Sequence, residues 1–95
     1  MEIECDPDKR AQTLLHRGLD MEEAAIIFGG PCITFSDLRK DYNETRLITI
    51  GLLRSRMVVL VWTWRTKVGR QNVRRIISIR KANEREQELY QNRLD

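Results

Sequence analysis

The sequence is poor in the residues that build cross-linked or metal-dependent proteins. It has two cysteines, Cys5 and Cys32, and one histidine, His16. Two cysteines so far apart cannot form a disulfide framework, and one histidine does not complete a zinc site. We therefore expect two ordinary buried thiols, no metal site and no cofactor.

Long hydrophobic runs are also missing. No stretch approaches the roughly 18 apolar residues that a membrane span needs. The opening Met1-Glu2-Ile3-Glu4 is acidic, whereas a secretory signal peptide begins with basic residues. We expect a cytoplasmic protein without membrane contact, and 95 residues predict a single domain over residues 1–95.

Acidic residues are absent from one long part of the chain. Residues 46–82 contain no Asp or Glu and ten basic residues, namely Arg46, Arg54, Arg56, Arg65, Lys67, Arg70, Arg74, Arg75, Arg80 and Lys81. Such a block predicts a positive surface, and phosphate backbones are its most common intracellular partner. The alternative is a sheet edge that arginine charges protect from aggregation.

Helix signals lie on both sides of this basic block. Asp6-Pro7 predicts the start of a helix over residues 7–17, which glycine 18 ends. Asp20, with a glutamate three residues later, predicts a second helix that stops at the Gly-Gly-Pro of residues 29–31. Asn83 and Glu86 form the same capping pattern for a final helix to about residue 93.

The basic block itself is predicted to form strands. Branched and aromatic residues dominate residues 46–53, 57–65 and 73–80, and the links between them have hairpin length. Residues 32–35 predict a further short strand, and residues 36–43 a polar loop. We expect an α+β fold in which two N-terminal helices pack on a small antiparallel sheet of three to four strands, followed by a C-terminal helix.

Alternation along the strands sorts the predicted sheet into two faces. One is apolar and is expected to pack on the helices: Ile48, Ile50, Leu52, Val58, Leu60, Trp62, Trp64, Ile77 and Ile79. The other is expected to be open and carries hydroxyls and arginines: Thr45, Thr49, Gly51, Val59, Val61, Thr63, Arg65, Arg74, Ser78 and Arg80. Arginines and hydroxyls bind phosphate oxygens, so this face is a candidate nucleic-acid groove. The alternative is a face left in water.

The two tryptophans could instead stack on bases, although their face favours packing.

Residues spread over the whole chain have the order and spacing of a known family. They are Asp6-Pro7-x-Lys9, Gly18, Glu22-Glu23-Ala24, Glu44-x-Arg46, Ile50-Gly51, Thr63-x-Arg65, the run from Arg75 to Ala82, Glu86 and Tyr90. In these residues the chain resembles the BrnT toxins, which are RelE-like proteins of type II toxin-antitoxin systems. It departs from the family at Cys5, where Trp is usual, at Thr13, where Asn is usual, and at residues 16–18, where Lys-His-Gly is usual.

The resemblance implies a RelE-like ribonuclease that needs no metal and inhibits translation by cleaving RNA. It further implies a cognate BrnA-like antitoxin with a ribbon-helix-helix part, through which alone the pair would contact operator DNA. In metal-free cleavage the 2'-hydroxyl attacks the adjacent phosphate, so the enzyme must stabilise charge on phosphorus and move two protons.

Candidate residues can be assigned to these tasks. We expect Arg65 and Arg80 to stabilise the charge, and the candidates for proton transfer are His16, Lys81, Tyr90, Glu86 and Glu44. Candidates for RNA binding are Arg17, Thr63, Arg74 and Ser78. Some of these candidates also have a purely structural explanation: His16 could be a solvated side chain, Glu86 could serve as a helix cap, and Tyr90 could be part of the packing of the last helix. A non-catalytic module that binds RNA or protein with the same basic face is the alternative function.

Overall fold

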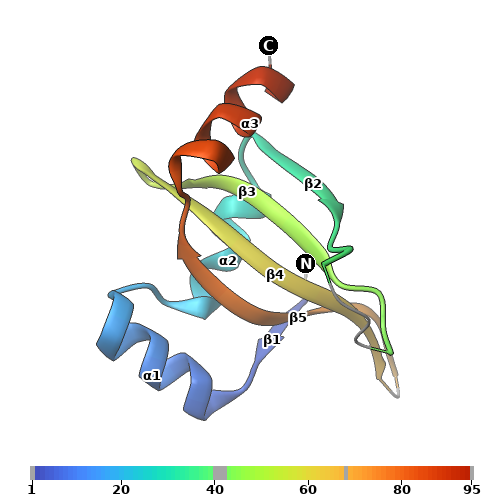
Figure 1. Ribbon diagram of the computed structural model, residues 1–95. Helices are drawn as coiled ribbons and strands as arrows, with labels where there is room; N and C mark the ends of the chain where they lie inside the picture. Colours follow the sequence, from blue (N-terminus) through green and yellow to red (C-terminus); the bar gives the residue numbers. More distant parts are fainter. Residues whose placement is uncertain (1, 40–42, 68, 95) are drawn as a thin grey trace.

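The structure is a computed structural model that describes residues 2–39, 43–67 and 69–94 (Figure 1). Its elements are, in chain order, β1 (Ile3–Cys5), α1 (Pro7–Arg17), the 3-10 turn η1 (Met21–Glu23), α2 (Ala24–Phe28), β2 (Cys32–Ser36), β3 (Leu47–Leu53), β4 (Arg56–Lys67), β5 (Arg70–Lys81) and α3 (Glu84–Leu94). The expected loop at 36–43 begins at residue 37, and its positions 40–42 lie outside the described residues. In the described part of the chain, no helix has the length and apolar character to cross a membrane.

The strands form one five-stranded mixed sheet in the order β1-β5-β4-β3-β2. Neighbours β2 to β5 pair antiparallel, whereas β1 pairs parallel to β5. The expectation of a purely antiparallel sheet with three to four strands is therefore wrong. β1 has three residues, which is too short for a recognisable alternation, so the pattern of the sequence does not reveal it.

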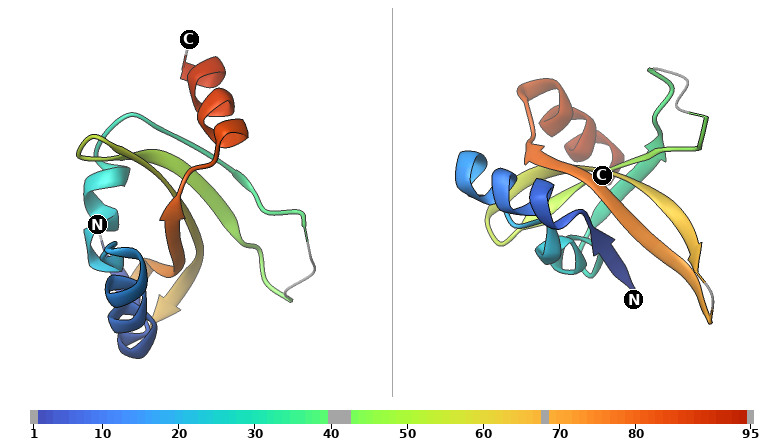
Figure 2. Two further views of the ribbon diagram at one scale, coloured as in Figure 1. Left: turned by 60° about the vertical axis from the view of Figure 1, so that its left-hand side comes forward. Right: turned by 90° about the horizontal axis from the view of Figure 1, so that it is seen from below.

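The predicted ends of α1 are confirmed, but its predicted packing is wrong. The Asp6 carboxylate accepts the backbone N–H of Asp8, and Gly18 ends the helix with a φ of 68°. However, α1 has no buried residue, and Leu15 is 79% exposed. Figure 2 shows α1 beside β1 and β5 rather than across a face of the sheet. The N-terminal segment that packs on the sheet is η1 with the five-residue helix α2.

A two-residue turn between β3 and β4 sets the register of the sheet. Leu53 pairs with Arg56, and Arg54 in the turn has a φ of 58°. Odd residues of β3 therefore lie opposite even residues of β4, so that Thr49 faces Leu60 and Ile50 faces Val59. The predicted sorting placed even-numbered residues of both strands on the same face. A shift of one residue in the pairing moves every side chain of a strand to the other face, so the predicted faces of β3 are exchanged.

Both faces of the sheet consequently carry a hydrophobic cluster. The α2 face packs on η1 and α2 through Leu19, Met21, Ala24, Ile27, Leu53, Val58, Leu60, Trp62, Ile76 and Ile79. The α3 face packs on α3 through Ile50, Val59, Ala82 and Tyr90, with Ile33, Phe35, Ile48, Met57 and Leu89 partly buried beside them. The prediction that Ile48, Ile50 and Leu52 share the tryptophan face is wrong, and the face predicted to be open is partly covered.

Gly51 lies where α2 packs tightly on the sheet. A Cβ atom at this position would lie 2.8 Å from Cγ2 of Ile27 and 3.0 Å from Cβ of Cys32. Gly51→Ala should therefore lower the free energy of unfolding by about 1–3 kcal/mol through overpacking, as measured by urea denaturation. Gly30→Ala is the matched control, because its Cβ would meet nothing closer than 3.8 Å. Equal effects of the two substitutions would contradict this account of the α2 packing.

Candidate nucleic-acid interface

Three adjoining hollows that share lining residues lie along α1 and β5. The first lies between α1 and β5 and is lined by Lys9, Gln12, Thr13, His16, Arg17, Met21, Ile77 and Ser78. The second continues from Arg17 to Leu19, Arg80 and Lys81. The third shares Lys9 and Ile77 with the first and adds Asp6, Glu44, Arg46, Arg65, Arg75 and Ile76. We call this surface the α1–β5 groove.

The short β1 strand explains why the groove exists. β1 ends opposite Ile76, so it covers only the first part of the β5 edge. Further along that edge the place of a neighbouring strand is taken by α1. Arg17 ties the helix to the strand, because its Nη1 donates a 2.8 Å hydrogen bond to the carbonyl oxygen of Ile79.

The groove is strongly basic. Its lining includes Lys9, His16, Arg17, Arg46, Arg65, Arg75, Arg80 and Lys81. Among the residues that the structure describes, the acidic ones that line the groove are Asp6 and Glu44, and both belong to the third hollow. There Glu44 lies 3.2 Å from Nη1 of Arg65 and 3.4 Å from Nε of Arg46. Positive charge is therefore least compensated in the hollows around His16, Arg17 and Lys81.

The structure does not bring Arg65 and Arg80 together, as the predicted site required. Both lie on the α3 face, but Arg80 pairs with Val59, which precedes Arg65 by six residues on β4. This offset corresponds to about 20 Å along the strand. The two guanidinium groups cannot contact the same phosphate.

Arg74 lies on the opposite side from the predicted one. A bulge separates Val61, which pairs with Ser78, from Trp62, which pairs with Ile76, so one extra residue of β5 inverts the alternation. The Arg74 guanidinium carbon consequently lies on the α2 face, 4.1 Å from the ring centre of Phe28 and 5.2 Å from that of Trp62. Cation–π contacts of this kind stabilise the fold and take Arg74 out of the predicted arginine face.

Two further predicted site residues lie within the protein rather than in the groove. Thr63 is 3% exposed, and its hydroxyl donates to the carbonyl oxygen of Thr45 at 2.7 Å. Tyr90 is 5% exposed, and its hydroxyl donates to the carbonyl oxygen of Pro31 at 3.1 Å. Both contacts are structural, and neither residue lines the hollows. Lys81, Ser78, Arg17 and His16 do line them.

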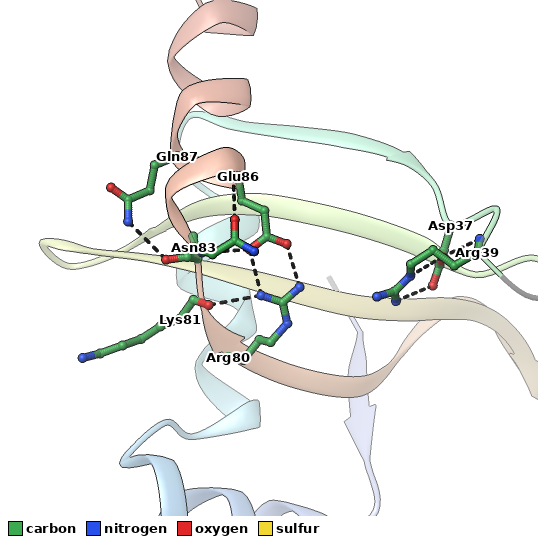
Figure 3. Close-up of polar contacts among 8 residues, drawn as sticks. Asp37, Arg39, Arg80, Lys81, Asn83, Glu86 and Gln87 are labelled. Carbon is green, nitrogen blue, oxygen red and sulfur yellow. Dashed lines mark hydrogen bonds and ion pairs between the residues drawn. The ribbon is translucent and has the colours of Figure 1, made fainter.

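Arg80 is held by the N-terminus of α3 (Figure 3). Its Nη1 and Nη2 donate to the two carboxylate oxygens of Glu86 at 2.8 and 2.6 Å. Glu86 also accepts the N–H of Asn83, and Asn83 accepts that of Glu86, so the predicted capping pattern is confirmed. The Arg80 guanidinium lowers the pKa of Glu86, while the carboxylate raises the pKa of Arg80.

Sequence reasoning named His16 but missed Lys9 and Gln12 on α1, and it missed Arg39. Lys9, Gln12, Thr13 and His16 recur at helical spacing, and this spacing could have revealed the wall that α1 contributes. Arg39 was missed because it belongs to the acidic part of the sequence. It donates from Nε and Nη2 to the two oxygens of Asp37, both at 2.8 Å.

Asp37 should make folding stability fall in acid. Its side chain is fully buried, and the hydrogen bond from Arg39 holds the pKa of Asp37 below the ordinary value of 3.8. Because the unfolded chain binds this proton at higher pH, the contribution is complete above the ordinary pKa and declines as the pH falls through it. Asp37→Asn should therefore lower the Tm at pH 7 and flatten the loss of Tm between about pH 5 and pH 2.

Asp8→Asn is the matched control for this measurement, since Asp8 is an exposed carboxylate of α1. It should leave the acid slope of the Tm nearly unchanged. If Asp37→Asn melts with the full slope of the unmodified protein, the ion pair does not contribute in the way described.

The groove and the fold define a small α+β protein with a basic surface hollow, a feature typical of proteins that bind nucleic acid. The chain belongs to a particular family of this kind. The family model described as "Ribonuclease toxin, BrnT, of type II toxin-antitoxin system" matches residues 5–86, which is most of the chain. The resemblance seen in the sequence is thereby confirmed. A comparison with curated proteins gives no match.

Proposed function

We propose that this protein is a metal-independent endoribonuclease that binds single-stranded RNA in the α1–β5 groove. The family supplies the class of activity, since its members are ribonuclease toxins. The observation that carries the assignment to the groove is that its three basic hollows adjoin one another, since they share the lining residues Arg17, Lys9 and Ile77. A row of cations along one such groove matches the row of phosphates of an RNA strand.

We assign the reaction to the second hollow, where Arg17 and Lys81 lie beside Arg80, whose charge Glu86 partly compensates. The 2'-hydroxyl attacks the adjacent phosphorus, and the bond from phosphorus to the 5'-oxygen of the next nucleotide breaks. Arg17 and Arg80 line one hollow, so a phosphate there contacts both, and their charge stabilises the added negative charge on phosphorus. His16 is the neighbour of Arg17 at the end of α1, and we assign to it one of the two proton transfers.

Other groove residues then have supporting roles. Lys81 is a second candidate for proton transfer, and Ser78 is a donor to phosphate oxygens from the β5 wall. Arg65 lies too far along β4 for the same phosphate, so we assign it to the RNA backbone on one side of the cleavage point. Thr63 and Tyr90 have no direct role in this proposal.

A purified-protein experiment tests the proposal. The protein is incubated with a labelled single-stranded RNA in EDTA, and with a 2'-O-methyl RNA of the same sequence. We expect the RNA to be cut into products ending in 2',3'-cyclic phosphate, and the 2'-O-methyl RNA to be bound but left intact. Cleavage of the 2'-O-methyl RNA would exclude attack by the 2'-hydroxyl, and RNA that is bound but never cut would favour the non-catalytic binding module.

As a toxin of a type II system, the protein has an antitoxin partner. We propose that this partner is a BrnA-like protein with a ribbon-helix-helix part, that it covers the α1–β5 groove with acidic or apolar segments, and that operator DNA is bound through it alone. The positive charge of the groove supports this arrangement. Growth arrest on expression, relieved by the neighbouring gene, would support the assignment, and salt-insensitive binding of the antitoxin would argue against a mainly electrostatic interface.

A further inference from the structure

Two arginines on the α3 side of the sheet are each held by a carboxylate through two hydrogen bonds. Arg80 is bound end-on by Glu86, and Arg39 is bound side-on by Asp37 (Figure 3). Arginines at the protein surface usually sample many rotamers, which costs entropy when they bind a ligand. These two guanidinium groups are already fixed.

The two carboxylates are themselves anchored. Asp37 has a fully buried side chain, and its backbone N–H donates to the carbonyl oxygen of Arg46 at 2.8 Å. Glu86 accepts the N–H of Asn83 at 2.8 Å, and its own position is set by α3. Because Asp37 and Glu86 are held by these contacts, their carboxylates fix the orientation of the Arg39 and Arg80 guanidinium groups.

Arg80 keeps one complete bidentate edge for a ligand. A guanidinium has five N–H donors. Glu86 takes one from Nη1 and one from Nη2, and the carbonyl oxygen of Lys81 takes the second of Nη1 at 3.2 Å. The N–H of Nε and the second N–H of Nη2 lie on the same edge, and within residues 2–39, 43–67 and 69–94 no acceptor bonds to them. This edge has the geometry that binds two phosphate oxygens.

Arg39 lies within electrostatic reach of this edge. The Arg39 charge adds to the lowering of the Glu86 pKa by Arg80 and opposes the rise that Glu86 causes in the Arg80 pKa, which places Arg39 near the pair although Asp37 and Arg80 lie at opposite sides of the sheet. Figure 3 shows the Arg39 guanidinium turned toward the side of Arg80. Two cations held near each other bind an anion more favourably than either alone, because the ligand relieves their mutual repulsion.

We infer that Arg39 and Arg80 form a phosphate-binding site on the α3 face for the backbone of the RNA, with Asp37 and Glu86 as positioning residues. This site rests on the proposed function, since Arg80 also lines the α1–β5 groove with Arg17 and Lys81. A strand that leaves the groove at Arg80 reaches Arg39 across the α3 face. The edge of Arg80 then contacts the phosphate at the cleavage point, and Arg39 extends RNA recognition to the neighbouring phosphate of the strand.

Binding of a non-cleavable probe tests the site. The probe is a fluorescein-labelled 2'-O-methyl RNA, and its Kd is measured by anisotropy over a range of salt concentrations. Arg39→Gln should weaken binding about fivefold to tenfold and reduce the slope of log Kd against log salt by about 0.7, the value for one lost phosphate contact on a single strand. Arg56→Gln is the matched control, because Arg56 is an exposed arginine that pairs with Leu53 on the α2 face.

The outcomes separate the site from the cleavage proposal. If Arg39→Gln and Arg56→Gln have the same Kd and the same salt slope, the site is wrong, even where the protein cleaves RNA. If natural RNA of the same sequence stays intact while Arg39→Gln alone loses affinity and slope, the cleavage proposal fails and the site stands. Failure of the unmodified protein to bind the probe at low salt would overturn both.

A second comparison tests the positioning role of Glu86. Glu86→Gln should lower kcat about tenfold, because Arg80 loses its fixed orientation. It should not raise KM, because the substitution also removes a negative charge near the RNA. Glu88→Gln makes the same charge change on an exposed residue of α3 and should leave kcat unchanged. An increase in kcat for Glu86→Gln would mean that Glu86 competes with phosphate for Arg80, and a changed Tm with unchanged kcat would reduce it to a structural role.

Discussion

Arg80→Ala should reduce kcat/KM for RNA cleavage by about 10²–10³-fold, the loss typical for removal of one well-placed donor to a developing charge. Arg80 presents a bidentate edge from a guanidinium that Glu86 and the Lys81 carbonyl fix in place. A donor of fixed orientation needs no reorganisation when the phosphate becomes more negative, so its contribution belongs to the transition state. Affinity for the 2'-O-methyl RNA should fall much less than the cleavage rate.

Arg54→Ala is the control for this measurement. Arg54 also forms an ion pair with a carboxylate, Glu23, but it lies in the β3–β4 turn and does not line the groove. The substitution therefore removes one arginine and one ion pair without touching the proposed site. Circular dichroism should show that both variants are folded. If Arg80→Ala then cleaves RNA within about threefold of the Arg54→Ala rate, Arg80 takes no part in the chemistry.

Local signals in the sequence predicted the helix ends correctly. The structure contains the Asp6-Pro7 start, the Gly18 stop and the reciprocal contacts of Asn83 and Glu86, and each of these signals joins groups only a few residues apart in sequence. Capping depends on backbone groups of the same turn, so it can be inferred without knowledge of the sheet. The same holds for the three long strands, whose composition alone predicts extended structure.

The faces of the sheet could not be predicted in the same way, because they depend on single residues in turns and bulges. A turn of two residues rather than three shifted the register of β3, and the extra residue Ile77 in β5 moved Arg74 to the α2 face. The predicted site therefore contained one arginine from the wrong side and two arginines too far apart. The groove arose from packing that the sequence pattern does not contain, namely the short β1 strand and the position of α1 beside β5.

Trp62→Ala should destabilise the fold by about 3–5 kcal/mol, which is a large part of the stability of a protein of this size. Trp62 is 3% exposed and meets Phe28 edge to face at 5.3 Å. Its indole N–H donates to the Thr49 hydroxyl at 2.8 Å, and Arg74 covers its ring. Truncation leaves a cavity between the sheet and α2 and leaves the Arg74 charge with less aromatic surface around it. Denaturant titration should show a much lower midpoint.

Trp64→Ala separates packing from nucleic-acid binding by the same aromatic group. Trp64 lies on the α2 face beside Trp62 and Arg74 but is 47% exposed, so its loss should cost no more than about 1.5 kcal/mol. If Trp62, Trp64 and Arg74 only support the fold, Trp64→Ala keeps the affinity for RNA and its cleavage rate below the melting temperature. If the exposed ring stacks on bases, Trp64→Ala weakens RNA binding without a matching loss of stability, and the α2 face becomes part of the RNA surface. The first outcome is expected, because the arginine that accompanies Trp64 is turned toward the rings of Phe28 and Trp62, whereas the Arg80 edge lies on the opposite face of the sheet.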